Sequence, residues 1–453
     1  MLTIGDRSWR FPGGRHGIAG GLGAALALLL ILGTAAAQEA APAVSTVHHA
    51  DWAVKADIYE VNVRQYSKQG TFAGVDRQLP RLKKMGVDIL WLMPINPIGK
   101  VNRKGTLGSY YAVADYMAVN PEFGTLDDFK HLVNHAHALG MKVIIDWVAN
   151  HTAWDNVWVT QHPEWYLKGA DGKIEAVHIG SGADAQVWSD VIGLDYSQPA
   201  LRTAMIDAMT WWVRETGIDG YRCDFATNVP TDFWVAARTA LEQIKPVFML
   251  AESDKPELVQ QAFDMTYDWD LYHLMVKIAH GQGDARDLAV FFHNPPKVYP
   301  KGAYQMVFTS DHDENSWNGS DEELYGKGFK VYAVLAATLP GMPLVYSGQE
   351  SGLDKRLQFF ERDPIDWDHY KLAGFYHRLL SLKHHDPALW NGSDGGDLTI
   401  LDPDNKEVFA FVRHKGNNTV TVDVNLSGAP QAVKGKGLKT ETLAPYAYRI
   451  TVQ

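Results

Sequence analysis

The stretch Gly217–Pro230, GIDGYRCDFATNVP, is bounded like a core strand of a parallel sheet, yet its strand-like part, YRCDFA, contains Arg222 and Asp224. In a strand, residues two apart point to the same face, so these opposite charges share one environment. One interpretation is a buried structural ion pair. The other is a catalytic carboxylate held by its arginine, and the stretch alone leaves both open.

Seven other short segments are similarly apolar and rich in β-branched, leucine and aromatic residues. Together with 219–226 they are 57–66, 87–95, 141–150, 246–253, 262–270, 304–313 and 341–348. Amphipathic helical patterns lie between many of them, such as 125–140 and 198–217, the latter ending on Gly217 as a C-cap. Strands separated by helices predict a parallel (β/α)8 TIM barrel, with a doubly wound sheet as the alternative.

Most of these predicted strands end in polar or charged residues. They are Asn150 and His151, Asp224, Glu252, Asp268 and Asp270, and His312 and Asp313. Barrel enzymes build their active sites at the carboxyl ends of their strands. We therefore expect these side chains to gather at one end of the barrel.

Two regions depart from the strand–helix alternation. Segment 152–196 is longer than a normal strand-to-helix loop, which predicts an inserted loop domain that forms one wall of a cleft. Past about residue 388 the apolar residues alternate with period two, with turns at 403–406 and 415–418. This alternation predicts a C-terminal antiparallel β-sandwich over 388–453. The barrel would then occupy 38–387.

Residues 1–37 have the pattern of a cleavable export signal. Arg7, Arg10 and Arg15 precede an apolar run over 17–37 that ends in small residues. The alternative is an uncleaved anchor helix, although the run is only marginally long enough to span a bilayer. We expect a secreted or periplasmic protein. Cys223 is the single cysteine of the chain, so no intrachain disulfide can form.

The composition is that of a soluble globular protein. The formal net charge of −11 argues against nucleic acid or an anionic membrane as a partner, because both need basic patches. No membrane contact is expected after signal cleavage. The sequence leaves the oligomeric state open.

Three acids at the ends of different predicted strands suit one type of chemistry: Asp224, Glu252 and Asp313. A retaining glycosidase needs a nucleophilic carboxylate and a protonated carboxylic acid about 5 to 5.5 Å apart, and neighbouring strands lie about 4.8 Å apart. Arg222 would keep Asp224 ionised. Glu252 follows an apolar run, and we expect those apolar surroundings to favour its protonated form.

The ordered motifs of the chain resemble the signature regions of the α-amylase family, glycoside hydrolase family 13. They are DWVANH (146–151), GYRCD (220–224), MLAES (249–253) and FTSDHD (308–313). Segments 108–133 and 339–350 are also similar to the family. The resemblance covers about 57–367 and implies a TIM barrel followed by a C-terminal β-sandwich.

The resemblance implies a role for each site residue. Asp224 would be the nucleophile, Glu252 the general acid/base, and Asp313 the acid that stabilises the transition state. The substrate-binding residues would be Tyr111, His151, Arg222 and His312. Without the motifs, each histidine is better explained as an ordinary loop residue, and Tyr111 as core packing. Four tryptophans of the inserted segment form either its own small core or a sugar platform: Trp154, Trp158, Trp165 and Trp188.

The chain also differs from the family pattern where many members bind calcium. Thr227 and Asn228 replace a Lys-His pair, and Gly193 stands where an aspartate often binds the ion. Losing a carboxylate weakens a calcium site, so no cofactor is expected to be required, and calcium is left open despite Asn150. Asp311 replaces a commoner asparagine and adds negative charge beside His312.

The leading hypothesis is a retaining hydrolase of α-1,4-linked glucans, acting on starch or maltooligosaccharides. The alternatives are a transglycosylase or isomerase, because a glycosyl-enzyme can be intercepted by a sugar, and an α-glucosidase for sucrose or trehalose. A non-catalytic glycan-binding protein is a more remote alternative, since such proteins typically lose one of the acids that this chain keeps. Endo or exo action and branch preference stay open.

Overall fold

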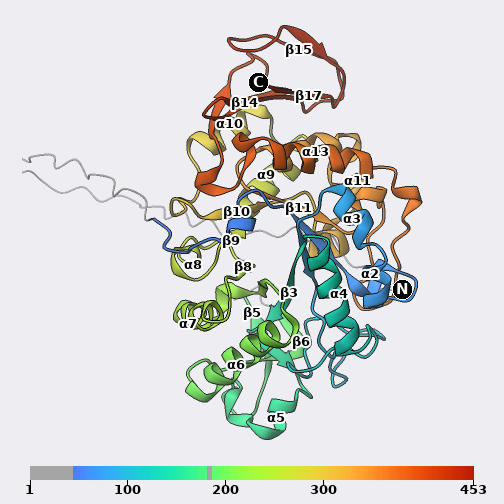
Figure 1. Cartoon of the computed structure of the whole chain (residues 1–453), viewed down its shortest axis with the longest axis vertical. Helices are drawn as coiled ribbons and strands as arrows, with labels where there is room; N and C mark the ends of the chain where they lie inside the picture. Colours follow the sequence, from blue (N-terminus) through green and yellow to red (C-terminus); the bar gives the residue numbers. More distant parts are fainter. Residues whose placement is uncertain (1–43, 181–185) are drawn as a thin grey trace, which may run out of the picture. The chain divides into compact units, whose positions relative to one another are not determined.

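The computed structural model describes residues 44–180 and 186–453, and its centre is a closed barrel of eight parallel strands (Figure 1). The strands are β1 (Ile58–Val61), β2 (Ile89–Leu92), β3 (Lys142–Val148), β7 (Gly220–Asp224), β8 (Phe248–Ala251), β9 (Met265–Tyr267), β10 (Tyr304–Val307) and β11 (Met342–Tyr346). Each predicted strand segment contains one of them. The predicted TIM barrel is confirmed, and the doubly wound alternative is wrong because β1 pairs with β11 and closes the sheet.

Helices connect the strands on the outside of the barrel. They are α1 (Val63–Tyr66), α2 (Phe72–Asp76), α3 (Leu79–Met85), α4 (Leu126–Ala138), α6 (Pro199–Thr216), α7 (Thr231–Glu242), α8 (Leu258–Gln261), α9 (Trp269–Ala279), α10 (Ala285–His293), α11 (Asp321–Tyr325), α12 (Phe329–Thr338) and α13 (Ala373–His385). Gly217 ends α6 in the left-handed conformation, with φ of 75°, as its position as a C-cap predicts. A capping box between Thr125 and Asp128 starts α4.

Strand alternation divides the apolar residues of the barrel into two layers. Side chains such as Ile58, Trp91 and Leu250 fill the interior, whereas Cys223 belongs to the layer between the strands and the helices. The prediction that Cys223 points away from Arg222 and Asp224 into the core is therefore confirmed. Arg222 pairs in register with Asp146 of β3, which places both at the carboxyl end of the interior.

The predicted insertion after β3 contains a small antiparallel sheet of β4 (His151–Ala153), β6 (Gln186–Gly193) and β5 (Ala176–Ile179), with α5 (Val157–Gln161) beside it. Its tryptophans lie in different surroundings, and their use as a sugar platform stays a prediction. Trp158 and Trp165 pack on each other and on the core of the barrel. Trp188 instead lies between His151 and Phe225, at ring distances of 5.7 and 5.3 Å.

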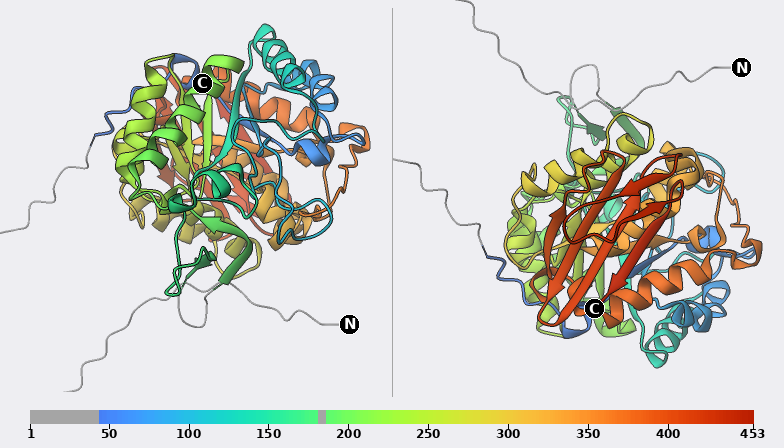
Figure 2. Two further views of the ribbon diagram at one scale, coloured as in Figure 1. Left: turned by 90° about the horizontal axis from the view of Figure 1, so that it is seen from below. Right: turned by 90° about the horizontal axis from the view of Figure 1, so that it is seen from above.

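The C-terminal region forms the predicted antiparallel structure (Figure 2). One sheet contains β12 (Asp397–Leu401), β13 (Val408–Lys415), β14 (Asn418–Asn425) and β17 (Tyr448–Val452), and a second contains β15 (Gln431–Val433) and β16 (Glu441–Leu443). Phe409 stacks on Phe292 of α10, and the buried Arg413 donates to the Thr338 carbonyl at the end of α12. The domain boundary near residue 388 stays a prediction.

The predicted export signal lies outside the described residues, and so do its cleavage site and the alternative of an anchor helix. Within residues 44–180 and 186–453, no helix is both long and apolar enough to cross a bilayer.

An ion cluster ties the amino ends of β1 and β2 to α13. His384 Nε2 lies 2.9 Å from Asp57 Oδ2 and 2.9 Å from Asp88 Oδ2. Burial opposes the charge on His384, but hydrogen bonds to the two carboxylates raise its pKa to about 9. Burial raises the pKa of Asp57 to about 6, although the hydrogen bond from His384 opposes that rise.

We expect His384→Gln to lose a pH-dependent part of the protein's stability. Because the folded-state pKa of His384 is raised to about 9, its contribution is fully present below the ordinary histidine pKa of about 6.5 and is lost as pH rises through 9. Thermal unfolding of both proteins at pH 6.5 and pH 10 checks this. The difference in Tm should shrink at pH 10, and an equal difference at both pH values would contradict the assignment.

Candidate active site

Several of the polar side chains predicted at the strand ends meet around one buried guanidinium group, that of Arg222 on β7. Asp268 instead caps α9, and Asp270 pairs with Lys297. Arg222 Nη1 lies 2.9 Å from Asp146 Oδ1 and 3.0 Å from Asp224 Oδ1, and its Nη2 lies 2.9 Å from Glu252 Oε2. Nε donates to the Tyr267 hydroxyl. One fixed cation thus orients carboxylates from three adjacent strands, β3, β7 and β8. The expectation that Arg222 and Asp224 share a face is confirmed.

Asp224 has the most perturbed electrostatic setting of the predicted acids. Burial, together with the charge of Glu252, raises its pKa well above the ordinary aspartate value, while Arg222 opposes the rise. The sequence predicts that Arg222 keeps Asp224 ionised; the structure corrects this, because burial and Glu252 together outweigh the effect of Arg222. Neighbouring carboxyl groups that share one cation favour keeping one proton among them. The pKa for losing that proton then belongs to the whole set of carboxyl groups and not to a single residue.

Glu252 lies in polar surroundings, not in the apolar ones expected from the preceding strand. Its Oε2 accepts from the Phe225 backbone N–H at 2.6 Å, in addition to the contact with Arg222, and its side chain is 20% exposed. Phe225 directs this N–H from the left-handed backbone conformation, with φ of 44°. The sequence suggested that apolar surroundings distinguish Glu252, the predicted acid, from Asp224, the predicted nucleophile. The polar contacts of Glu252 do not support that distinction.

A second chain of contacts holds His312. Its Nδ1 lies 2.6 Å from Glu60 Oε1, and its Nε2 lies 2.7 Å from the Tyr111 hydroxyl and 3.3 Å from Asp313 Oδ2. Burial opposes protonation, but the charges of Asp313 and Glu60 raise the pKa of His312 well above its ordinary value. The imidazolium in turn lowers the pKa of Asp313 against the effect of burial. Asp313, 39% exposed, is the most open of the three predicted acids.

Tyr111 links this chain to Arg222. Its hydroxyl also donates to Asp146 Oδ2 at 3.1 Å, and its ring stacks on His312 at a centroid distance of 5.3 Å. Of the predicted substrate-binding residues, Tyr111 therefore contacts His312 directly and is linked to Arg222 through Asp146.

His151, the remaining predicted substrate-binding residue, carries no charge near neutral pH. Burial lowers its pKa to about 4. The Asn150 amide lies 3.1 Å from Nδ1, and Nε2 lies 3.9 Å from Asp224 Oδ2. With the amide donating to Nδ1, Nε2 carries the proton toward the site. His151 can thus donate one hydrogen bond there without adding charge.

Several residues of the site were missed from the sequence. Glu60 is fully buried on β1, and Trp91 of β2 donates its indole N–H to Asp146 Oδ2. A lone acid within the apolar run IYEV is the signal that could have identified Glu60. Asp311, predicted to add charge beside His312, is buried, and its carboxylate accepts from the Glu314 backbone N–H. Burial raises its pKa well above the ordinary value.

An open groove of about 330 Å³ lies next to the site. Its wall includes Trp317, Phe359 and Phe360, and Phe359 also stacks near Tyr111 at 6.2 Å. Trp317 is 51% exposed and packs on Phe359 at a centroid distance of 5.2 Å. Exposed aromatic faces beside polar groups suit the apolar faces of sugar rings.

The residues near the family's calcium position do not form a suitable donor set. A Cβ atom at Gly193 would lie 3.0 Å from Leu167 Cδ1, so this position faces an apolar side chain. Asn150 is bound to His151. In the described part of the chain, acid and histidine groups that converge as metal ligands lie elsewhere, at Asp76–His131–His135 and Asp57–Asp88–His384. Calcium prefers six to eight oxygen ligands, which these residues do not supply.

Comparison with known proteins places this arrangement in one family. The family model described as "Alpha amylase, catalytic domain" matches residues 48–173 and 185–386. The crystal structure of an α-amylase from Lactobacillus plantarum is 32% identical to the chain, with a TM-score of 0.77, and the match covers 88% of this chain and 99% of that one. The chain therefore belongs to the α-amylase family, as its motifs suggested, and its barrel is the family's catalytic domain.

Two curated relatives have different activities in their names. The α-amylase MalA of Haloarcula japonica is 28% identical over 405 residues, which cover 84% of this chain. The α-1,4-glucan:maltose-1-phosphate maltosyltransferase of Rhodospirillum rubrum is 34% identical over 424 residues, which cover 83% of this chain. In both cases the match spans 57% of the relative's own length.

The contact between Glu60 and His312 predicts the effect of Glu60→Gln. The glutamine carbonyl can still accept from Nδ1–H, but the charge that stabilises the imidazolium is lost, so the pKa of His312 should fall. Titration of the imidazole resonances by NMR measures the change. Asp232→Asn, which neutralises an exposed carboxylate on α7, is the control. An unchanged His312 pKa in Glu60→Gln would contradict the assignment.

Proposed function

We propose that the protein is a retaining α-glucan hydrolase that cleaves α-1,4-glucosidic bonds of starch or maltooligosaccharides. The observation that carries the proposal is the shared guanidinium of Arg222, which holds Asp224 and Glu252 at the carboxyl ends of adjacent strands. A retaining mechanism needs its two carboxyl groups close together, and the binding of both groups by one guanidinium supports such an arrangement. The α-amylase names of relatives support the choice of substrate.

In the first step, Asp224 attacks the anomeric carbon and forms an ester bond with the sugar. The glycosidic C–O bond breaks, and Glu252 delivers a proton to the departing oxygen. The proposed mechanism places this proton on Glu252, and Asp224 attacks as a carboxylate bound to Arg222. Removal of the negative charge from Glu252 leaves Arg222 to stabilise the Asp224 carboxylate.

In the second step, Glu252 takes a proton from a water molecule, whose oxygen attacks the anomeric carbon and releases Asp224. The Phe225 N–H, which donates to Glu252, and the ion pair with Arg222 hold the carboxylate in place between the two steps. Two displacements at the same carbon retain the α configuration.

The other site residues would bind the sugar that is attacked. Asp313, exposed and with a lowered pKa, can accept hydrogen bonds from two neighbouring hydroxyls as an ionised carboxylate. His312 and neutral His151 supply N–H donors, and Tyr111 supplies a ring face. The aromatic side chains of Trp317 and Phe360, in the wall of the groove, would bind the glucose units of the glucan that lie beyond the cleaved bond.

Transfer to a sugar acceptor is the second candidate function, because the glycosyl-enzyme is the same and the maltosyltransferase relative is 34% identical. Small α-glucosides such as sucrose remain alternative substrates, although a groove of about 330 Å³ beside the site favours longer ones. The non-catalytic alternative is disfavoured because all three acids converge on the site. Action outside the cytoplasm, after removal of residues 1–37, is part of the proposal.

Asp224→Asn and Glu252→Gln should each reduce turnover of maltoheptaose by at least about 10³-fold, since each variant removes a group that acts in bond cleavage. Time-resolved proton NMR checks both the rate and the anomer first formed, which should be α in the parent protein. Asp232→Asn, a change in an exposed carboxylate on α7, is the control and should keep full activity. Unchanged turnover in either site variant would remove the assignment, and products longer than the substrate would indicate transfer.

Treatment with a calcium chelator should leave the Tm and the rate of maltoheptaose hydrolysis largely unchanged. The reason is that Gly193 supplies no carboxylate and Leu167 lies against its position. Calorimetry and activity assays before and after exhaustive dialysis against EGTA check this expectation. A loss of both Tm and activity that added calcium restores would overturn it.

A further inference from the structure

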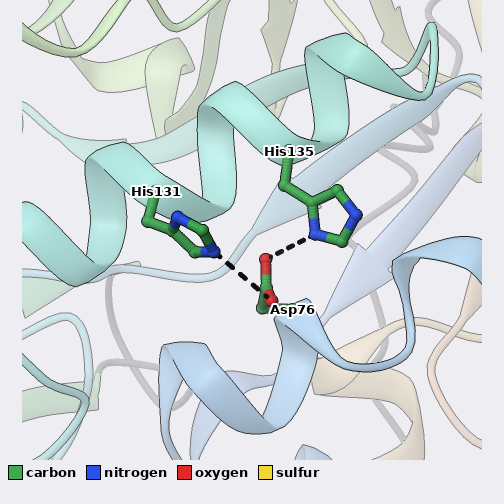
Figure 3. A group of neighbouring side chains, drawn as sticks. All are labelled: Asp76, His131 and His135. Carbon is green, nitrogen blue, oxygen red and sulfur yellow. Dashed lines mark hydrogen bonds and ion pairs between the residues drawn. The ribbon is translucent and has the colours of Figure 1, made fainter.

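A cluster of two histidines and one aspartate lies on the outside of the barrel, apart from the candidate active site (Figure 3). His131 and His135 come from α4, and Asp76 is the last residue of α2. Since α4 runs back from the carboxyl ends of the strands toward β3, its final turns, with His135, lie toward the amino ends of the strands. Asp224 and the other predicted acids lie at the opposite ends.

The three side chains already converge. His135 Nδ1 lies 2.9 Å from Asp76 Oδ1, and His131 Nε2 lies 3.8 Å from Asp76 Oδ2. One ligand atom from each residue can be chosen so that all three lie within 4.8 Å of one another. Donor atoms of a tetrahedral zinc site are about 3.3 Å apart when each bond to the ion is about 2.0–2.1 Å. Small side-chain rotations therefore suffice to bring these atoms to a common ion.

The backbone under the cluster is held firmly. Residues four apart lie on the same face of a helix, so both imidazoles project from one side of α4. The opposite side of α4 is buried through Phe129, Leu132, Val133 and Ala136. Phe72 at the start of α2 packs on Phe129 at a ring distance of 5.3 Å. The two helices are thus fixed relative to each other, and the ligand positions are set before an ion binds.

The local charges also favour a cation. In the part of the chain that the structure describes, the ion pairs of Asp76 are formed with these two imidazoles, and no lysine or arginine neutralises it. The second converging group differs: His384 has a raised pKa between Asp57 and Asp88, and Lys83 also pairs with Asp88. That group already contains two basic side chains, His384 and Lys83, whereas Asp76 is paired with the two imidazoles alone in the described part of the chain.

We propose that Asp76, His131 and His135 bind a divalent transition-metal ion of the zinc type. The two imidazole nitrogens that face Asp76 and one carboxylate oxygen are the ligands, and solvent supplies the fourth, since the His131 side chain is 73% exposed. Two imidazoles and a carboxylate suit zinc better than calcium or magnesium, which prefer oxygen donors alone. Binding cross-links α2 to α4 and stabilises the folded barrel without entering the glucan site.

The test is zinc binding by isothermal titration calorimetry to the metal-free full chain at pH 7.5, together with Tm at increasing ZnCl₂. The variants are His131→Ala, His135→Ala and Asp76→Asn, and the control is His280→Ala, which removes an exposed histidine outside the cluster. Each cluster variant should lower the affinity for zinc at least about tenfold. Losing a side chain that only hydrogen-bonds to a metal ligand already costs about this much. The Tm of the parent protein should rise with zinc, and this rise should be absent from the cluster variants.

A second readout separates metal binding from a merely structural role of the cluster. Zinc competes with protons for the imidazoles, so the affinity of the parent protein should fall between pH 7.5 and pH 5.5. The rate of maltoheptaose hydrolysis should be the same in His131→Ala and the parent, which makes the result independent of the proposed function. Zinc affinity and Tm shifts in the cluster variants equal to those of the parent and of His280→Ala would overturn the proposal.

Discussion

The site depends on the burial of one guanidinium among three carboxylates. Arg222 is almost fully buried, with Asp146, Asp224 and Glu252 within 3.0 Å of its nitrogens. One positive charge cannot balance three negative ones in a medium of low dielectric constant. Some of these carboxyl groups must therefore be protonated, or other groups must donate hydrogen bonds to them. The Tyr111 hydroxyl, the Trp91 indole and backbone N–H groups provide those donors. The remaining excess of negative charge favours the binding of a proton by these carboxyl groups, and the proposed mechanism needs such a proton.

The charge network extends across the barrel to β1 and β10. His312 carries a second buried positive charge, and it contacts Glu60 on one side and Asp313 on the other. Tyr111 connects the two cations, because its hydroxyl contacts both His312 and the aspartate bound to Arg222. Strands that are distant in sequence therefore share one electrostatic system, and a change at one end alters proton affinity at the other.

The sequence predicted the barrel and the three acids because their signals are local. Each strand is a short apolar run; Asp224 ends one of them, Glu252 directly follows another, and Asp313 lies in the polar segment that follows β10. Glu60 could not be placed on the same basis, since its partner His312 is 252 positions away in the chain and becomes its neighbour only when β1 closes the barrel. The prediction of apolar surroundings for Glu252 was wrong for a related reason. The apolar run before Glu252 packs elsewhere, and the residues that contact the Glu252 side chain come from β7 and the residue that follows it.

The conformation of Phe225 links catalysis to folding in one peptide unit. A non-glycine residue in the left-handed region costs roughly 1–2 kcal/mol, and here that conformation directs the N–H that binds Glu252. A glycine at this position would relieve the strain but widen the range of directions in which the N–H could point. The chain thus gives up some stability to fix the orientation of Glu252, the proposed general acid/base. Selection for greater stability alone would act against this arrangement.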